Sequence, residues 1–417
     1  MKRIMVLAGG NDQAALIQEL KIKYPKCFVV LIDMAKNVVA SKVADKHLVI
    51  STMDFDAVKQ AAIDEKIDII LTACGDQPLL TMAVVSEELG LPCYLSKTQV
   101  LNLTNKKFMK KLMVENGIPT SKYKAFQSIE EIDESGLEYP LMVKPADCNG
   151  SKGVRKVLNH TDLIEQAKIS IKFSISNTII VEEFNEGEDV SSDFYVYDGN
   201  VIPVMDCLSN KYKPTNEIAV IYQSVIPPAI SDNVRAELQI IAEKIAKVYE
   251  IKNSPLLIQT IVKGDKIRVV EFSARLGGGA KYKTIQNVTG FNVLRANLNS
   301  MLGEAPFINV RPSNKVCSRC HLYTKGGMYM GIDGLKDLLK DGVIEDFILT
   351  RPTGTEVSPP KSSGDRVASV FIAANDVEDL KVRVKTAMNR ISIIDQNGND
   401  IFLREMYDEP VKNAYGF

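Results

Sequence analysis

Two apolar segments that lie far apart in the chain constrain its fold, because each ends in charged and small residues suited to one shared cleft. Residues 141–145 (Leu-Met-Val-Lys-Pro) predict a buried strand that runs into a loop of small residues. Residues 269–275 (Val-Val-Glu-Phe-Ser-Ala-Arg) predict a second strand, which runs into three consecutive glycines. The first segment offers a cation and flexible backbone amides to phosphate oxygens. The second offers a carboxylate for a divalent metal and a guanidinium for developing charge, so the pair suggests ATP-driven acyl activation.

The first hundred residues alternate between short apolar strands and helices. The expected strands are 3–7, 27–32 and 67–71, and the expected helices are 11–23, 55–65 and 78–89. This order predicts a small doubly wound α/β sheet.

A nicotinamide dinucleotide site is the alternative reading of this region. Gly9 and Gly10 follow the first strand, and Asp33 lies about 20 residues further on, as in such sites. The fingerprint needs further glycines where residues 11–13 (Asn-Asp-Gln) stand, so the backbone cannot approach a pyrophosphate closely. We expect the glycine turn only to start a helix.

Composition and charge limit the class of protein. The 417 residues allow roughly two to four domains. They carry 51 Lys and Arg against 52 Asp and Glu, a net charge of −1, so neither nucleic acid nor membrane is an expected partner. No apolar run reaches the length of a membrane span, and residues 1–3 lead straight into a strand instead of a signal peptide. The seven scattered cysteines argue against a disulfide framework, so we expect a cytoplasmic protein with reduced thiols.

Residues 317–321 (Cys-Ser-Arg-Cys-His) match the pattern of covalent haem attachment. That chemistry requires export, and the segment alternates as a strand does. The chain has three histidines and no second cysteine pair, so neither haem nor zinc is favoured here.

A helix is expected from Thr104 to Met113, capped by Thr104 or Asn105 and stopped by Gly117. Its first turn holds Lys106 and Lys107, where the helix dipole disfavours a cation unless an anion lies nearby. The pair is therefore either a solvated surface feature or part of an anion site.

An acidic stretch follows a predicted strand at 178–181. Residues 182–190 can form a hinge whose backbone pairs with adenine, with a carboxylate such as Glu188 on the ribose hydroxyls. An exposed acidic turn is the alternative. No G-x-x-x-x-G-K-[ST] motif occurs in the sequence, so any phosphate loop belongs to a hairpin lid and not to a P-loop.

Taken in order, these motifs resemble the ATP-grasp superfamily, and more narrowly its carboxylate–amine ligases, similar to the L-amino-acid ligase, biotin carboxylase and carbamoyl-phosphate synthase large-subunit branch. The resemblance implies an α/β and α+β multidomain fold. Its implied parts are a preATP-grasp Rossmann-like domain (1–100), an ATP-grasp domain (101–310) with a small lid (120–182) and a larger subdomain (183–310), and a C-terminal α+β cap (311–417).

The resemblance also implies roles for individual residues. For the nucleotide these are Lys106 and Lys144 at the phosphates, Gly150, Ser151 and Gly153 in a mobile loop, Glu182, Glu183 and Phe184 as the adenine hinge, and Glu188 at the ribose. For the chemistry they are Gln259, Glu271 and Ser273 on the metal side, Arg275 and Lys144 as catalytic groups, and Arg275, Gly277, Gly278 and Gly279 beside the carboxylate substrate. Residues 281–283 (Lys-Tyr-Lys) follow, and a solvated basic turn explains them as well as a substrate contact does.

The sequence departs from the family's metal strand, which reads Glu-x-Asn-x-Arg, because Ser273 stands in the asparagine position. A serine hydroxyl is a shorter oxygen ligand, and it reaches a magnesium ion only if the backbone or a water adjusts. One metal is then held through water, or catalysis is lost and only binding persists.

The implied activity is ATP-dependent joining of a carboxylate to an amine through an acyl phosphate, with ATP and Mg²⁺ (or Mn²⁺) as cofactors. The implied partners are small-molecule acid and amine substrates, with a possible homodimer. The alternatives are a carboxylase or carbamate-type phosphoryl transfer on the same scaffold, and a non-catalytic ATP-binding module.

Overall fold

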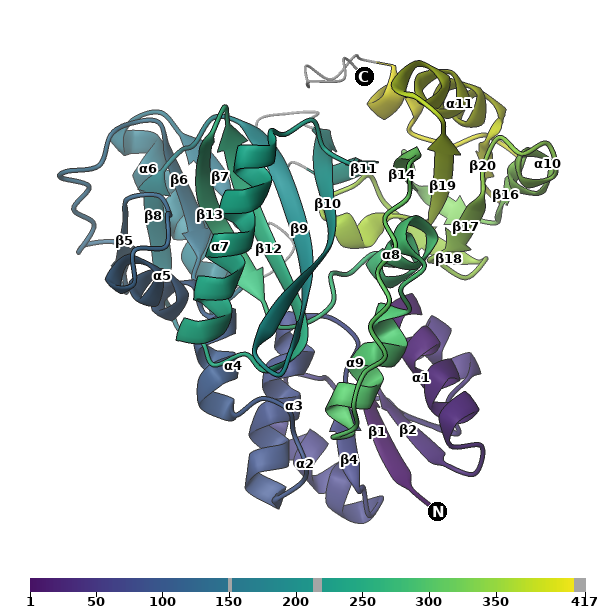
Figure 1. Ribbon diagram of the computed structural model, residues 1–417, viewed down its shortest axis with the longest axis horizontal. Helices are drawn as coiled ribbons and strands as arrows, with labels where there is room; N and C mark the ends of the chain where they lie inside the picture. Colours follow the sequence, from purple (N-terminus) through teal and green to yellow (C-terminus); the bar gives the residue numbers. More distant parts are fainter. Residues whose placement is uncertain (149–151, 213–219, 409–417) are drawn as a thin grey trace.

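The computed structural model describes residues 1–148, 152–212 and 220–408 of the chain. Figure 1 shows an N-terminal α/β unit at the bottom of the view, a small lid at the upper left and the C-terminal elements at the upper right. A long twisted sheet runs between them.

The N-terminal unit is a four-stranded parallel sheet in the order β3-β2-β1-β4. Its elements are β1 (Arg3–Leu7), α1 (Asn11–Lys23), β2 (Phe28–Ile32), η1 (Val39–Lys42), β3 (Lys46–Leu48), α2 (Phe55–Asp64), β4 (Ile69–Leu71) and α3 (Asp76–Leu89). The predicted doubly wound sheet is therefore confirmed. The Asp33 carboxylate accepts a hydrogen bond from the Gly9 amide at 2.7 Å, which gives this acid a structural role in the turn before α1.

The predicted start of the helix at Thr104 is wrong, because Thr104 is the last residue of one helix and a second helix begins at Lys106. They are α4 (Lys97–Thr104) and α5 (Lys106–Glu115). Asn105 ends α4 and caps α5, accepting a hydrogen bond from the Lys107 amide. The Ser96 hydroxyl and the Gln99 side chain form a capping box that starts α4, a signal that the sequence carried.

The lid is a four-stranded antiparallel sheet in the order β5-β8-β6-β7. It comprises β5 (Tyr123–Phe126), β6 (Leu141–Pro145), β7 (Arg155–Val157), α6 (His160–Ser170), η2 (Ile171–Phe173) and β8 (Ile179–Glu183). Because β8 continues through Glu183, the expectation that an acidic hinge begins at Glu182 is corrected. Strand pairing on both sides of β8 holds Glu182 and Glu183 in the sheet.

The long sheet has eight strands in the order β13-β12-β9-β10-β11-β14-β19-β17. They are β9 (Glu188–Tyr197), β10 (Asn200–Tyr212), β11 (Val220–Ile226), β12 (Asn253–Lys263), β13 (Lys266–Ser273), β14 (Val316–Leu322), β17 (Asp346–Leu349) and β19 (Ala368–Ala374). The helices between them are α7 (Asp232–Val248), α8 (Lys281–Thr289) and α9 (Val293–Met301). Strands from residues 316–374 thus extend the sheet begun by residues 188–273, so the C-terminal region shares one sheet with the region before it.

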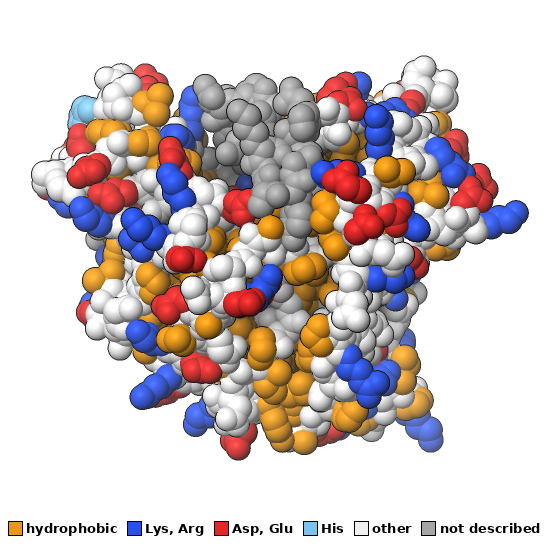
Figure 2. Space-filling model, turned by 45° about the horizontal axis from the view of Figure 1, so that its top comes forward, with side chains coloured by type: hydrophobic (Ala, Val, Ile, Leu, Met, Phe, Trp, Pro, Cys, Tyr) orange, Lys and Arg blue, Asp and Glu red, His pale blue; other side chains and the backbone are white. Residues whose placement is uncertain are grey.

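The remaining C-terminal elements flank this sheet. They are β15 (Gly327–Tyr329), β16 (Gly331–Asp333), α10 (Leu335–Lys340), β18 (Thr355–Val357), η3 (Ser363–Asp365), α11 (Val377–Arg390), β20 (Ser392–Ile394) and η4 (Arg404–Tyr407). Two short pairings, β15 with β18 and β16 with β20, close the region. Figure 2 shows basic and acidic side chains interspersed over the face that it draws, in keeping with the balanced charge of the chain. Across the described ranges, no helix combines the length and apolar character that crossing a membrane requires.

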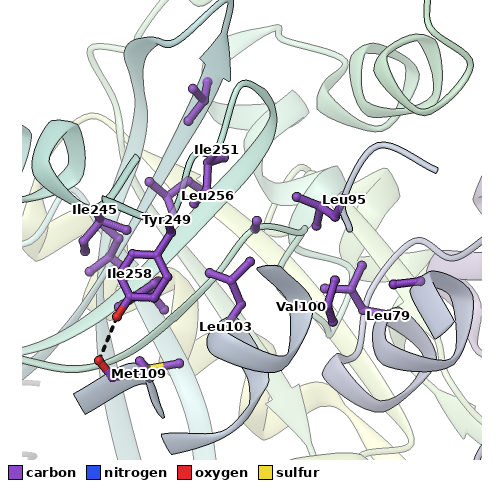
Figure 3. Close-up of a cluster of buried hydrophobic side chains, with 14 of the residues drawn as sticks. Leu79, Leu95, Val100, Leu103, Met109, Ile245, Tyr249, Ile251, Leu256 and Ile258 are labelled. Atoms are coloured by element: carbon purple, nitrogen blue, oxygen red, sulfur yellow. Dashed lines mark hydrogen bonds between the residues drawn. The ribbon is translucent and has the colours of Figure 1, made fainter. Parts of the chain in front are cut away.

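A hydrophobic core joins the N-terminal helices to the long sheet (Figure 3). The side chains labelled there are Leu79, Leu95, Val100, Leu103 and Met109 from one side, and Ile245, Tyr249, Ile251, Leu256 and Ile258 from the other. The Tyr249 hydroxyl donates to the carbonyl oxygen of Met109 at 2.7 Å, which ties α5 to the end of α7. Full burial stabilises each such side chain by roughly 1.5–3 kcal/mol. This packing holds α5 in place, and it therefore also positions the side chains of α5 that lie outside the core.

Candidate functional site

A cavity of about 520 Å³ opens where the N-terminal unit, α5, the β12–β13 pair and the C-terminal region meet. Its lining includes Asp12, Asp76, Lys106, Gln259, Glu271, Ser273, Arg275, Gly278, Gly279, Arg351 and Arg366. The structure therefore brings together Lys106, Gln259, Glu271, Ser273, Arg275 and two of the three glycines that the sequence singled out.

Glu271 lies in β13 directly opposite Gln259 of β12. The Lys106 ammonium lies 3.1 Å from Glu271 Oε2 and donates to the carbonyl oxygen of Cys148 at 3.2 Å. The nearby Lys106 charge lowers the pKa of Glu271, so this carboxylate is ionised at neutral pH. The anion expected beside the first turn of α5 is thus a protein carboxylate in this structure.

Arg275 and Ser273 share one acid, Asp76, which begins α3. Arg275 Nε lies 2.6 Å from Asp76 Oδ1, and Arg275 Nη2 lies 2.8 Å from Oδ2. The Ser273 hydroxyl donates to Asp76 Oδ1 at 2.8 Å. Burial alone would raise the pKa of Asp76, but the Arg275 guanidinium holds it below its usual value. Asp76 was not among the predicted site residues, because an acid at a helix start beyond the carboxyl end of a parallel strand can line a cleft or belong to a plain turn.

Lys144 points to Glu182 and not into open space. Glu182 Oε1 accepts a hydrogen bond from Lys144, and Lys110 Nζ lies 2.6 Å from Glu182 Oε2. Burial alone would raise the pKa of Glu182, but Lys144 and Lys110 together lower it to about 2. Lys110 was missed by sequence reasoning, which had no means of pairing a helix residue with one in β8.

Two backbone amides at the end of β8 already donate hydrogen bonds within the lid. The Glu183 amide donates to the carbonyl oxygen of Lys122 at 3.0 Å, and the Phe184 amide donates to that of Pro140 at 2.9 Å. The Lys156 ammonium lies 3.9 Å from the centre of the Phe184 ring. Glu188 begins β9 on the other side of this short connection.

The predicted phosphate loop is described only in part, because Gly150 and Ser151 lie outside the described residues. Gly153 has a φ of +69°, and a side chain there would come within 2.9 Å of Phe173. Its carbonyl oxygen accepts hydrogen bonds from Gln166 at 3.1 Å and from Ser170 at 2.6 Å. Gly153 is therefore held against α6.

A second, smaller cavity of about 110 Å³ is lined in part by the three glycines. A side chain at Gly279, whose φ is +77°, would overlap the Arg366 guanidinium. Lys281 also lines this cavity, and its ammonium lies 2.8 Å from Asp193 Oδ2 and 2.6 Å from Ser191 Oγ. The reading of Lys281 as part of a solvated basic turn is therefore wrong.

Arg319 reaches the same small cavity from β14. It is 2% exposed, and its Nε donates to Thr284 Oγ1 at 3.0 Å. Within the described part of the chain, its Nη1 and Nη2 have no hydrogen-bond partner. Burial lowers the pKa of Arg319 to about 10, which leaves it charged at neutral pH. A buried guanidinium with two unsatisfied donor groups is suited to an anionic ligand group.

Arg319 lies in the Cys-Ser-Arg-Cys-His segment, which the sequence analysis considered only as a haem or zinc pattern, so the arginine was not predicted as a site residue. Strand alternation places Arg319 and His321 on the cavity side of β14, while Cys320 packs in the core on the other side. His321 Nδ1 lies 2.7 Å from Ser369 Oγ. Burial, followed by the charges of Arg366 and Arg319, lowers the pKa of His321 well below its usual value, so the ring is neutral. Among the described residues, no group of three or more His, Cys, Asp and Glu side chains could hold a metal ion.

Comparison with known proteins gives two matches to protein families. Residues 137–283 match the ATP-grasp domain, and residues 321–395 match the L-amino acid ligase C-terminal domain 2. The chain is 22% identical to a phosphoribosylamine–glycine ligase of Lactococcus lactis subsp. lactis, over 95% of this chain and 97% of that protein. It is 24% identical to an L-arginine-specific L-amino acid ligase of Bacillus subtilis, over 68% of this chain and 71% of that protein. Against the longer trifunctional purine biosynthetic protein adenosine-3 of Drosophila melanogaster it is 26% identical over 45% of this chain, and the match spans 15% of that protein.

Solved structures share the fold at low sequence identity. The L-amino acid ligase from Bacillus licheniformis has a TM-score of 0.76 at 18% identity, covering 95% of this chain and 99% of that one. The N5-carboxyaminoimidazole synthetase from Staphylococcus aureus, complexed with ADP, has a TM-score of 0.71 at 16% identity, covering 93% and 96%.

Proposed function

We propose that this chain, which carries an ATP-grasp domain and an L-amino acid ligase C-terminal domain, is an ATP-dependent carboxylate–amine ligase. In this reaction a carboxylate is phosphorylated to an acyl phosphate, and an amine then displaces the phosphate. The observation that carries the proposal is the pairing of Lys106 with Glu271 and of Arg275 with Asp76 around one cavity. Cations and carboxylates held in place before substrate arrives are what positioning and charge stabilisation require.

The nucleotide is proposed to bind between the lid and β13. Lys106 and Lys144 would contact its phosphates, and we propose the same role for Gly150, Ser151 and Gly153. Because the Glu183 and Phe184 amides already donate to the lid, the adenine would pair with groups at and just beyond the end of β8, including the Glu183 carbonyl oxygen. Glu188 would take the ribose hydroxyls. The ADP in the similar synthetase structure supports an adenine nucleotide as the ligand.

A Mg²⁺ (or Mn²⁺) ion would be held by Glu271 and Gln259, which lie side by side on β13 and β12, together with nucleotide phosphate oxygens. These are the hard oxygen donors that Mg²⁺ prefers, and such sites take most of their ligands from phosphate and water. When bound, the ion supplies positive charge to the phosphate oxygens. Lys106 would then leave Glu271 for the phosphates. Ser273 would contribute through water, because its hydroxyl donates to Asp76.

The proposed reaction has two steps. An oxygen of the substrate carboxylate attacks the γ-phosphorus as the bond to the β–γ bridging oxygen breaks, which releases ADP. The amine nitrogen then attacks the acyl carbon, the bond to the phosphate oxygen breaks, and the nitrogen gives up a proton. Arg275 would stabilise the charge on the transferring phosphoryl group and on the acyl phosphate. The amides of residues 277–279 would hold anionic groups of the substrates, together with Arg319 Nη1 and Nη2, for which the described residues supply no hydrogen-bond partner.

Nucleotide turnover with defined acid and amine pairs tests the proposal. ADP release from MgATP should require two substrates, and mass spectrometry should find a product lighter than their sum by one water. A carboxylase or carbamate-type reaction on this scaffold would instead depend on bicarbonate. A non-catalytic binding module would bind MgATP and release no ADP with any mixture, which would overturn the proposed activity.

A further inference from the structure

Helix α5 directs two lysines, one turn apart, toward two different carboxylates. Lys106 and Lys110 have the i, i+4 spacing that places side chains on one face of a helix. Lys106 pairs with Glu271 of the long sheet, and Lys110 pairs with Glu182 of the lid. The helix therefore connects the two halves between which the nucleotide is proposed to bind.

Glu182 is shared by two cations inside the protein. Lys144 donates to one carboxylate oxygen, and Lys110 lies 2.6 Å from the other. The Lys110 side chain is 0% exposed, and those of Lys144 and Glu182 are 5% and 7% exposed. Two lysines on one carboxylate leave a net positive charge in a buried place. Because an uncompensated charge is costly to remove from water, this site favours the binding of a further anion.

Lys110 is fixed by more than its ion pair. Its ammonium donates to Thr120 Oγ1 at 2.8 Å, and that hydroxyl donates to the carbonyl oxygen of Val269 in β13 at 2.9 Å. The ammonium also lies 5.3 Å from the centre of the Tyr123 ring. A lysine held from three sides keeps its charge at one place beside Glu182.

We propose that Lys110 is a positioning residue that weakens the hold of Glu182 on Lys144 and thereby sets the affinity of the site for nucleotide phosphates. The inference rests on the proposed function, in which Lys144 contacts those phosphates. If Lys144 were the only cation on Glu182, the two would form a closed neutral pair that phosphate has to break. With Lys110 on the same carboxylate, neither ammonium has a full countercharge, so phosphate oxygens complete the pairing of Lys144.

The protonation of Lys110 makes this arrangement sensitive to pH. Burial lowers the pKa of Lys110 to about 8, against the opposing attraction of Glu182. The charged and titratable groups facing it are Glu182 and Lys144 of the lid, Lys106 on its own helix and Tyr123 of β5. Burial raises the pKa of Tyr123, which keeps the phenol neutral in this range. Above about pH 8 Lys110 loses its proton, Glu182 holds Lys144 alone, and nucleotide should bind less tightly.

Titration calorimetry of the full chain with MgATP and with MgADP tests the inference without knowledge of the acid or amine. K110M should raise the Kd about tenfold at pH 7.5, which corresponds to about 1.4 kcal/mol. K110R keeps the charge at every pH, so it should bind nearly as the wild type does at pH 7.5. The wild-type Kd should rise several-fold from pH 7.5 to pH 9, and both variants should lose that rise.

K111M is the matched control, because Lys111 stands next in the same helix, is 68% exposed and pairs only loosely with Glu115 at 3.9 Å. It should bind nucleotide with the wild-type Kd and the wild-type pH dependence. Wild-type affinity and pH dependence in K110M would overturn the inference and leave the proposed function intact. A wild-type protein that binds neither nucleotide would overturn the proposed function and the inference with it. If K110M does not fold by circular dichroism, the pH profiles of the wild type and of K110R decide the matter.

Discussion

Asp76 and Arg275 form a two-point ion pair that joins the start of α3 to the end of β13, with Nε–Oδ1 and Nη2–Oδ2 distances of 2.6 and 2.8 Å. The pair sets the plane of the guanidinium that is proposed to stabilise the transferring phosphoryl group. Asp76 also accepts a hydrogen bond from the Ser273 hydroxyl, so one carboxylate orients two neighbouring groups of the site. The N-terminal unit thus takes part in the candidate chemistry through Asp76.

Replacing Asp76 by asparagine should lower ADP release about 100-fold, because Arg275 loses both its orientation and its countercharge. A guanidinium that is only 14% exposed and has lost its countercharge should also destabilise the fold by about 3 kcal/mol. Steady-state turnover and thermal melting measure the two effects. Asp56→Asn, which changes an exposed acid in the first turn of α2, is the control: it should leave turnover unchanged and cost at most about 1 kcal/mol of stability. Full turnover in Asp76→Asn would show that Arg275 does not depend on this partner.

Ser273→Asn should lower the Mg²⁺ concentration needed for half-maximal nucleotide turnover. An asparagine oxygen extends further than a hydroxyl and can reach an ion at Glu271 directly. A magnesium titration of ADP release measures the shift. Ser273→Ala, which removes the oxygen, should not lower the requirement. An unchanged requirement in Ser273→Asn would mean that residue 273 stands outside the metal site.

Gly279→Ala should impair use of the acid substrate, because the new side chain would overlap Arg366 at the junction of the two cavities. The positive φ adds a backbone cost of about 1–3 kcal/mol. We expect a raised KM for the acid and a lowered Tm. Gly278→Ala is the matched control, since the nearest atom to its side chain would be Cys74 Sγ at 4.0 Å. Equal effects at both positions would show that the overlap with Arg366 is not the cause.

Arg319→Met should separate stability from activity. The substitution removes a buried charge with two donor groups that no described residue satisfies, each costing about 1–3 kcal/mol, while keeping much of the side-chain volume. The Tm should therefore rise, while substrate-dependent ADP release should fall about 100-fold. Differential scanning calorimetry and a turnover assay on the same preparation make the comparison. A lowered Tm with normal turnover would make Arg319 a purely structural residue.

Much of the fold could be predicted from local patterns. Alternating strands and helices in the first hundred residues gave β1 and α1 with their bounds, and the order of motifs from Lys106 to Arg275 predicted the ATP-grasp superfamily, which the match at residues 137–283 confirms. The roles given to individual site residues stay predictions. The division at residues 100 and 310 also stays a prediction, and the continuous sheet from β9 to β19 was not foreseen.

Three residues of the candidate site could not be found this way, because each depends on contacts between distant segments. Lys110 is one lysine among several on α5, and only the fold places Glu182 beside it. Arg319 stood inside a segment whose cysteines and histidine drew attention to metal chemistry. Asp76 follows β4 at a helix start, and only the fold shows that Arg275, at the end of β13, lies beside it.

The central claim is that a carboxylate is activated as an acyl phosphate, and transfer of ¹⁸O tests it most directly. An acid that supports ADP release is labelled with ¹⁸O in both carboxylate oxygens, and the phosphate formed during ligation is examined by mass spectrometry. We predict that the phosphate carries one ¹⁸O atom for each molecule of product, because the bond from the acyl carbon to the bridging oxygen breaks when the amine attacks. Phosphate without ¹⁸O, released in step with product, would contradict an acyl phosphate intermediate.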